Sequence, residues 1–219
     1  MSEHYRVIAP DLPGLGESDS PPDPYTPESI AQIVADGLQR AWPSLTGPPH
    51  TPPATDATLE DGLRICGFSF GGMIAGLTAG RIAPHVRQLV LIGASGLGGR
   101  FDNLSPTYKL PRDADPQALE EVHRANLAMM MIHDPAAIDA LALRIQAVNA
   151  PRTRVMSPKD ALTMKLADAL RDGGFPFDSV WGEYCIFRPD LERRRELLAT
   201  IRPDAEFHVI PGAGHWAQY

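Results

Sequence analysis

Cysteine is scarce in this sequence of 219 residues, which has only Cys66 and Cys185. Their spacing fits neither a zinc site nor a Cys-x-x-Cys motif, and a single disulfide would not by itself stabilise a domain of this size. We therefore expect two free thiols and a reducing, cytoplasmic environment.

Long apolar runs and an excess of positive charge are also missing. No run approaches the roughly 18 residues that cross a bilayer, and the first residues lack the apolar stretch of a secretion signal. Lys and Arg number 20 against 27 Asp and Glu, a net charge of −7, so no basic field attracts phosphates. The sequence predicts a protein that binds neither membranes nor nucleic acids.

Hydrophobic residues make up 43% and charged residues 21% of the chain, which is typical of a packed globular domain. Turn formers are abundant, with 19 glycines and 22 prolines. Four of these prolines fall within Thr46 to Thr58, a stretch without periodicity that we interpret as an exposed loop.

Short apolar runs alternate with helical patterns in the first 99 residues. We expect a strand at Tyr5 to Ala9, a helix capped by Thr26 that ends near Trp42, and a strand at Leu63 to Cys66. A small-residue helix over Met73 to Ala83 then leads to a fully buried strand at Val86 to Ala94. Strand, helix and strand in this order predict an α/β fold with a mostly parallel sheet and right-handed crossovers.

From Arg100 to Asp172 the pattern is helical, as in Gln117 to Met131 and Pro135 to Val148, and no strand is expected. We therefore divide the chain into a first part of the α/β core (1–99), an inserted helical lid (100–172) and a second part of the core (173–219). The last part is predicted to hold a strand at Ser179 to Gly182, a helix at Leu191 to Ile201 and a strand at Phe207 to Ile210.

The motif Gly67-Phe-Ser-Phe-Gly71 lies between a predicted strand and a predicted helix. A serine is a weak nucleophile unless a tight turn exposes it beside a histidine base, and Ser69 is placed for that role. The backbone N–H of Phe70 would begin the helix, where it can stabilise an oxyanion. His215 follows the last predicted strand in a glycine-rich loop and is the candidate base.

The order of four motifs resembles the α/β-hydrolase superfamily. They are Asp11-Leu-Pro-Gly-Leu-Gly-Glu-Ser18, the turn around Ser69, Trp181-Gly-Glu183 and Gly212-Ala-Gly-His-Trp216. Three further features are similar to the hydrolases that cleave a carbon–carbon bond in ring-fission products of aromatic degradation: Gly96-Leu-Gly98, Arg144 and His215-Trp-Ala-Gln218. This resemblance implies that Arg144 and Trp216 line the substrate pocket beneath the lid.

The chain departs from the family pattern at the acid that orients the histidine. The resemblance places this acid two residues after Trp-Gly-Glu, and Cys185 stands there. A thiol is a poor substitute for a carboxylate that holds the imidazole tautomer and stabilises the imidazolium. Glu183 and Asp190 are the two candidates to replace it, and Asp190 also suits the cap of the following helix.

The resemblance also implies three strands before Tyr5 and a His-Gly loop that supplies a second oxyanion donor, and the sequence starts after them. We accordingly expect a sheet that lacks the N-terminal strands, with unpaired strand edges that favour association. Tyr219 ends the sequence where relatives continue into a closing helix.

Two functions follow. The first is a serine hydrolase without metal or organic cofactor, acting through Ser69 and His215 on an ester, a lactone or a vinylogous diketone. The alternative is an inactive or fragmentary hydrolase-like protein, which Cys185 and the expected truncation favour. The sequence leaves open whether the chain forms a homo-oligomer.

Overall fold

A computed structural model describes residues 7–45, 62–99, 107–110, 115–156 and 158–219. Its centre is a sheet of four strands in the order β1-β2-β3-β4, and every neighbouring pair is parallel. The strands are β1 (Leu63–Phe68), β2 (Val86–Ile92), β3 (Phe177–Gly182) and β4 (Phe207–Ile210). The α/β fold with a parallel sheet is therefore confirmed.

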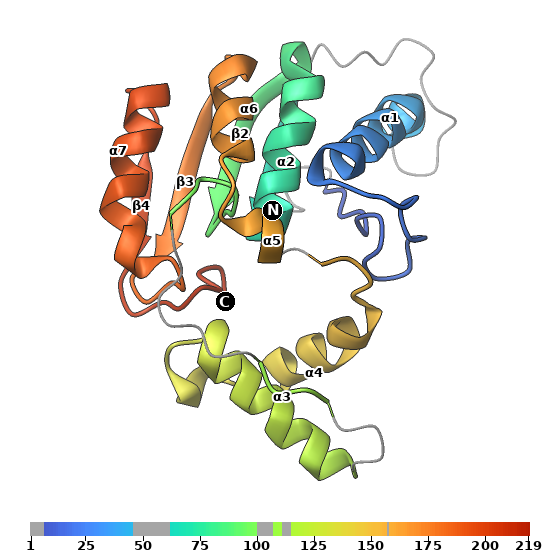
Figure 1. The fold of residues 1–219 in the computed structure, drawn as a ribbon, viewed down its shortest axis with the longest axis vertical. Coiled ribbons are helices and arrows are strands. Elements are labelled where there is room, and N and C mark those ends of the chain that lie inside the picture. The colour runs from blue at the N-terminus through green and yellow to red at the C-terminus, as the bar shows by residue number, and fades with distance from the viewer. Residues whose placement is uncertain (1–6, 46–61, 100–106, 111–114, 157) are drawn as a thin grey trace.

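Four helices form a row along one face of the sheet, and neighbours in the row contact each other (Figure 1). They are α1 (Pro27–Leu45), α2 (Phe70–Arg81), α6 (Lys165–Gly173) and α7 (Leu191–Ile201). Short 3-10 turns, η2 (Ala83–His85) and η5 (Arg188–Asp190), precede β2 and α7. In the described part of the chain, no helix is long and apolar enough to cross a membrane.

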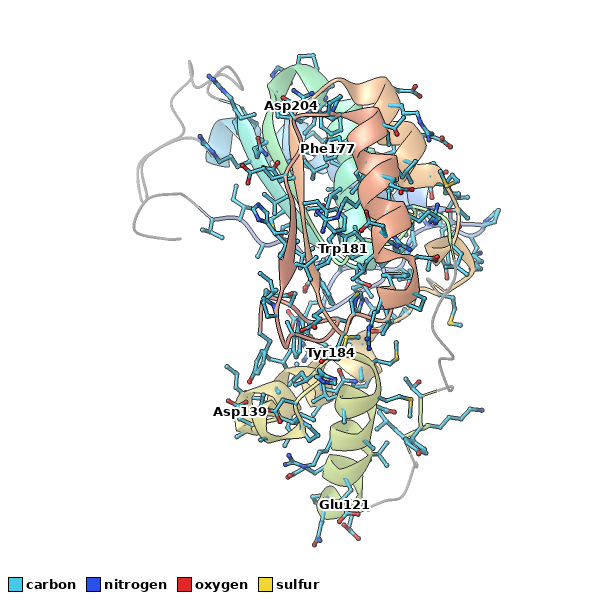
Figure 2. All side chains as sticks on the ribbon, turned by 90° about the vertical axis from the view of Figure 1, so that its left-hand side faces the viewer. Glu121, Asp139, Phe177, Trp181, Tyr184 and Asp204 are labelled. Atoms are coloured by element: carbon cyan, nitrogen blue, oxygen red, sulfur yellow. The ribbon has the colours of Figure 1, made fainter. Side chains whose placement is uncertain are left out.

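The main core lies between the sheet and this row of helices. Leu89 and Leu91 of β2 point into it and have no exposed surface, and Phe177 and Trp181 of β3 are equally buried. Figure 2 shows Phe177 and Trp181 along the length of β3. In β2 the intervening residues are exposed or half-buried, so the prediction of a fully buried strand is wrong. The physical reason is that the helices of the row cover one face of the sheet.

The segment at the start of the chain also differs from expectation. Residues 7–9 belong to no strand, and Tyr5 and Arg6 lie outside the described residues, as does the loop predicted at Thr46 to Thr58. The helix near Thr26 is confirmed: the Thr26 hydroxyl accepts a hydrogen bond from the backbone N–H of Ser29 at 3.1 Å, and α1 begins at the next residue, Pro27.

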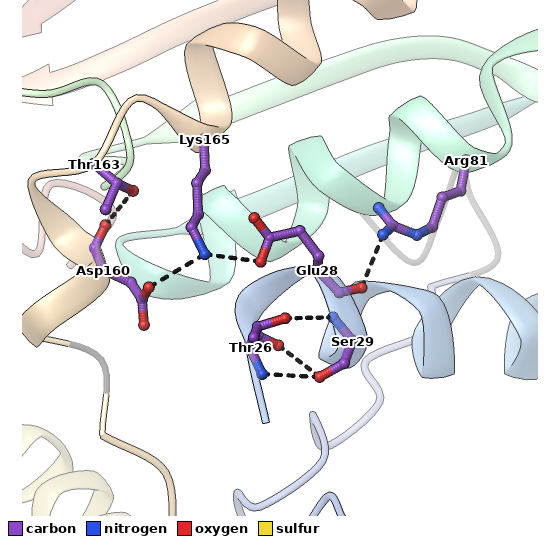
Figure 3. Close-up of polar contacts among 7 residues, drawn as sticks. All are labelled: Thr26, Glu28, Ser29, Arg81, Asp160, Thr163 and Lys165. Atoms are coloured by element: carbon purple, nitrogen blue, oxygen red, sulfur yellow. Dashed lines mark hydrogen bonds and ion pairs between the residues drawn. The ribbon is translucent and has the colours of Figure 1, made fainter. Parts of the chain in front are cut away.

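Polar contacts fix α1 to the rest of the core (Figure 3). The ammonium of Lys165 lies 2.8 Å from Glu28 of α1 and 3.4 Å from Asp160. Arg81 of α2 donates to the backbone carbonyl of Glu28 at 2.9 Å. These contacts join α1 to both α2 and α6.

A pair of helices, α3 (Pro116–Met130) and α4 (Ala140–Asn149), lies apart from the row, beyond the end of the sheet that carries the C-terminus (Figure 1). This α3–α4 pair has its own small apolar cluster, formed by Leu127, Ile132, Ile138 and Ala142. The described part of 100–172 contains helices and no strand, as predicted. Its remaining elements are η3 (Pro135–Ala137), η4 (Ala150–Arg152) and α5 (Pro158–Ala161).

Candidate active site

Ser69 occupies the sharp turn between β1 and α2. Its φ of 53° and ψ of −118° make it the one non-glycine residue with positive φ among those the structure describes. The turn is held by hydrogen bonds, because the N–H of Ser69 donates to Ile92 at 2.9 Å and the N–H of Ser95 donates to the Ser69 carbonyl at 3.1 Å. A strained backbone that its surroundings fix in this way is typical of functional residues.

The loop that follows β4 brings His215 to this turn. The loop packs directly on the end of β3, where a Cβ at Gly182 would lie 1.8 Å from the carbonyl oxygen of Gly214. The N–H of Trp216 donates to Met131, just past α3, at 2.8 Å. The histidine is thus positioned by the sheet on one side and by the α3–α4 pair on the other.

The imidazole of His215 meets the serine hydroxyl at hydrogen-bond distance. Its Nε2 atom lies 2.9 Å from Oγ of Ser69, and only 1% of the residue is exposed. The ring packs against Phe68, with centroids 4.9 Å apart, and against Phe187 at 5.6 Å. Burial, together with the nearby charge of Arg194, lowers the pKa of His215 to about 3, so the imidazole is neutral at pH 7.

The other ring nitrogen meets a thiol. Sγ of Cys185 lies 3.0 Å from Nδ1 of His215. The two carboxylates that could have replaced an acid here lie elsewhere: Glu183 accepts a hydrogen bond from the N–H of Gly212 at 2.9 Å, and Asp190 lies 3.9 Å from Nε of Arg193. The expectation that Glu183 or Asp190 replaces the acid finds no support, because Cys185 holds the position at Nδ1.

Asp190 does sit at the N-cap position of α7, but its side chain makes no capping hydrogen bond. Both cysteines are free, as predicted, with Cys66 exposed and Cys185 buried.

Sequence reasoning missed Arg194, which lies behind the site. The side chain has no exposed surface, and its guanidinium sits 4.0 Å from the ring centroid of Phe187. It donates to the backbone carbonyls of Ala94 at 3.3 Å and Gly98 at 3.0 Å. No signal in the sequence distinguishes Arg194, because it is the middle member of three consecutive arginines in a charged helix.

The remaining predicted site residues lie at different distances from the serine turn. Phe70 is the first residue of α2, so its N–H has no partner within the helix and adjoins Ser69. Trp216 follows His215 and packs against the cluster of the α3–α4 pair. Arg144 lines a cavity of about 780 Å³ between α3 and α4, together with His123 and Leu143. Neither Ser69 nor His215 lines that cavity, so the structure does not bring Arg144 to the serine.

Among the described residues no group of three or more His, Cys, Asp or Glu side chains could hold a metal ion. The groups that the site brings together are the hydroxyl of Ser69, the imidazole of His215 and the thiol of Cys185.

Comparison with known proteins connects this geometry to hydrolases. A sequence profile described as the alpha/beta hydrolase family matches residues 1–219. The chain is similar to the 2-hydroxy-6-oxo-6-phenylhexa-2,4-dienoate hydrolase of Burkholderia cepacia, with 27% identity over 98% of this chain and 72% of that protein. It is also similar to the 2-hydroxy-6-oxo-2,4-heptadienoate hydrolase of Pseudomonas putida, with 29% identity over 100% of this chain and 74% of that protein.

Solved structures show the same fold. A meta-cleavage product hydrolase from Pseudomonas fluorescens, complexed with acetates, superposes with a TM-score of 0.70 and 23% identity, covering 99% of this chain and 75% of the other. A thermophilic esterase from Thermogutta terrifontis gives a TM-score of 0.59 and 20% identity, over 98% of this chain and 74% of the esterase.

Proposed function

The chain belongs to the alpha/beta hydrolase family, and from that premise we propose that it is a serine hydrolase in which Ser69 is the nucleophile and His215 the base. The observation that carries the proposal is the 2.9 Å contact between Nε2 of His215 and Oγ of Ser69, made on a backbone turn strained at the serine. Nucleophile and base within hydrogen-bond distance are the recurrent feature of covalent acyl transfer.

The reaction would proceed in two halves. Oγ of Ser69 attacks the substrate carbonyl while its proton passes to Nε2 of His215, and the N–H of Phe70 donates to the oxyanion that forms. The imidazolium then gives this proton to the leaving group as the bond to the carbonyl carbon breaks. Water attacks the acyl-serine in the same manner, releases the acid and restores both side chains.

The substrate is a small carbonyl compound: an ester, a lactone or a vinylogous diketone cleaved at a carbon–carbon bond. The dienoate hydrolases to which the chain is similar support the last of these. We assign the α3–α4 pair as a lid over the site, because Trp216 packs on its apolar cluster directly after His215. Trp216 and Arg144 are the proposed substrate contacts. Because Arg144 lines a cavity that Ser69 and His215 do not line, it would bind a part of the substrate remote from the reacting carbonyl.

Labelling with a fluorophosphonate probe, read by peptide mass spectrometry, tests the nucleophile. We expect the probe on the peptide that holds Ser69, no label in Ser69→Ala, and unchanged labelling in Ser20→Ala, which removes an exposed serine hydroxyl outside the site. The Cys185→Asp variant is included because it supplies the carboxylate found in related triads. Absence of label from Ser69 in both the natural sequence and Cys185→Asp, with both folded, would refute the proposal.

A further inference from the structure

The partner of His215 Nδ1 decides whether the imidazole is ready to act as a base. A neutral imidazole carries one proton, so one ring nitrogen donates and the other accepts. A base for Ser69 needs the proton on Nδ1 and a free lone pair on Nε2. The atom opposite Nδ1 is Sγ of Cys185, at 3.0 Å.

We propose, on the basis of the serine hydrolase function above, that the Cys185 thiol donates its proton to Nδ1 and thereby holds the imidazole proton on Nε2. In this arrangement Nε2 donates to Oγ of Ser69 across the 2.9 Å contact instead of accepting from it. Cys185 is then a positioning residue that keeps the site in a resting state.

The surroundings of the sulfur set the direction of its hydrogen bond. Cys185 is buried, with only 2% of the residue exposed, so water does not compete for its S–H proton. A thiol sulfur is a weak acceptor and the hydroxyl oxygen of Ser69 is a better one, so the single imidazole proton makes the stronger hydrogen bond from Nε2. The S–H proton remains, and Nδ1 of His215 is the acceptor that faces it.

Burial keeps both groups neutral. It raises the pKa of the Cys185 thiol to about 11, although the Phe187 N–H, the charge of Arg194 and the Ile186 N–H lower it. Burial and the charge of Arg194 lower the pKa of His215. Burial therefore favours a neutral thiol beside a neutral imidazole over the ion pair of a thiolate and an imidazolium.

Charge around the site makes the resting state resist activation. Before Ser69 can lose its proton, the imidazole proton must move to Nδ1, and the imidazolium that then forms faces Arg194 with no anion at position 185. Arg193 and Asp190 act on the charge of Arg194 with opposite signs, and they lie 3.9 Å from each other. The proposal therefore predicts a slow nucleophile.

A carboxylate at position 185 would reverse both the placement of the imidazole proton and the unfavourable charge around the imidazolium. It would lie near the Arg194 charge and accept the Nδ1 proton, which frees Nε2 to act on Ser69. The pocket around Cys185 thus suits an anion better than the thiol that occupies it.

The test is ¹⁵N NMR of the full chain, uniformly labelled with ¹³C and ¹⁵N, at pH 7, with the signals of His215 assigned through backbone connectivities. We expect a protonated Nε2 and an unprotonated Nδ1 in the natural sequence, and the reverse in Cys185→Asp. Cys66→Ser, which changes the second cysteine of the chain, on β1, should leave the His215 signals unmoved. In parallel, the fluorophosphonate labelling rate of Ser69 should rise about 10²-fold or more in Cys185→Asp.

Each outcome is decisive. A proton on Nδ1 in the natural sequence would overturn the proposal, and this measurement depends on no variant that must fold. An Nε2 proton combined with no labelling of Ser69 even in Cys185→Asp would keep the tautomer assignment and refute the hydrolase function. An Nε2 proton with equal labelling rates in both chains would show that Cys185 does not control the nucleophile.

Discussion

Gly67 faces the backbone carbonyl of Gly71 so closely that a Cβ at position 67 would lie 2.5 Å from that oxygen. The same Cβ would lie 2.7 Å from Cβ of Ala75 in α2. We therefore predict that Gly67→Ala lowers the free energy of unfolding by about 1–3 kcal/mol, or more, because the strand and the helix must separate. Urea unfolding measures the change, and fluorophosphonate labelling of Ser69 should fall with it.

Gly71 provides the matched control, because it is the second glycine of the same motif and nothing lies within 4 Å of a Cβ placed there. Gly71→Ala should leave folding intact or stabilise α2 by roughly 0.5–1 kcal/mol, since alanine favours a helix over glycine. Equal loss of stability in the two variants would contradict the close approach at Gly67.

The two thiols should differ in reactivity. Cys66 is exposed on β1, whereas Cys185 is buried; partial burial raises the pKa of the Cys66 thiol, and burial raises that of Cys185 to about 11. Since the thiolate is the reactive form, iodoacetamide at pH 8 should modify Cys66 in the folded chain and Cys185 only after unfolding. Intact mass and peptide mapping read the result. Rapid modification of Cys185 in the native state would show that the site opens to solvent.

Much of the fold could be predicted because its periodic segments are also its buried segments. The predicted bounds of the last helix and last strand, Leu191 to Ile201 and Phe207 to Ile210, match the structure. The prediction that β2 is buried on both faces was wrong. A continuous apolar run does not reveal that the row of helices covers one face of the sheet. Local patterning reports hydrophobicity, whereas the cover over each face is a property of the whole fold.

The candidate site divides in the same manner. Ser69 and His215 stand in glycine-rich turns with a recognisable chemistry, and the structure brings them together. Arg194 could not be found, because a buried and an exposed arginine in one helical run look alike in sequence. The contact of Cys185 with Nδ1 could be anticipated by position alone, but the burial of the thiol and the imidazole depends on how the turn after β3 packs in the whole fold.

The role of Arg144 can be separated from a general effect on the lid. If Arg144 binds the carboxylate of a dienoate substrate, Arg144→Ala should raise KM for that substrate by roughly 10- to 100-fold and leave KM for a neutral ester unchanged, because one charge-assisted hydrogen bond contributes roughly 1.5–3 kcal/mol. Arg171→Ala, which removes an exposed arginine paired with Asp168 on α6, is the control. Equal KM changes for both substrates would assign Arg144 to packing of the α3–α4 pair.

The stability of the fold should depend on pH through His215. Burial and the charge of Arg194 lower its pKa to about 3 from an ordinary value of 6.5, so between these values the unfolded chain binds the proton and the folded chain does not. The free energy of unfolding is therefore unaffected above pH 6.5 and falls as the pH drops below it, by about 2 kcal/mol between pH 7 and pH 5. Urea unfolding at the two pH values measures this slope. In His215→Gln the contribution disappears, and in Cys185→Asp it should shrink or change sign, because a carboxylate at Nδ1 raises the pKa of the imidazole. An unchanged slope in both variants would mean that another group titrates.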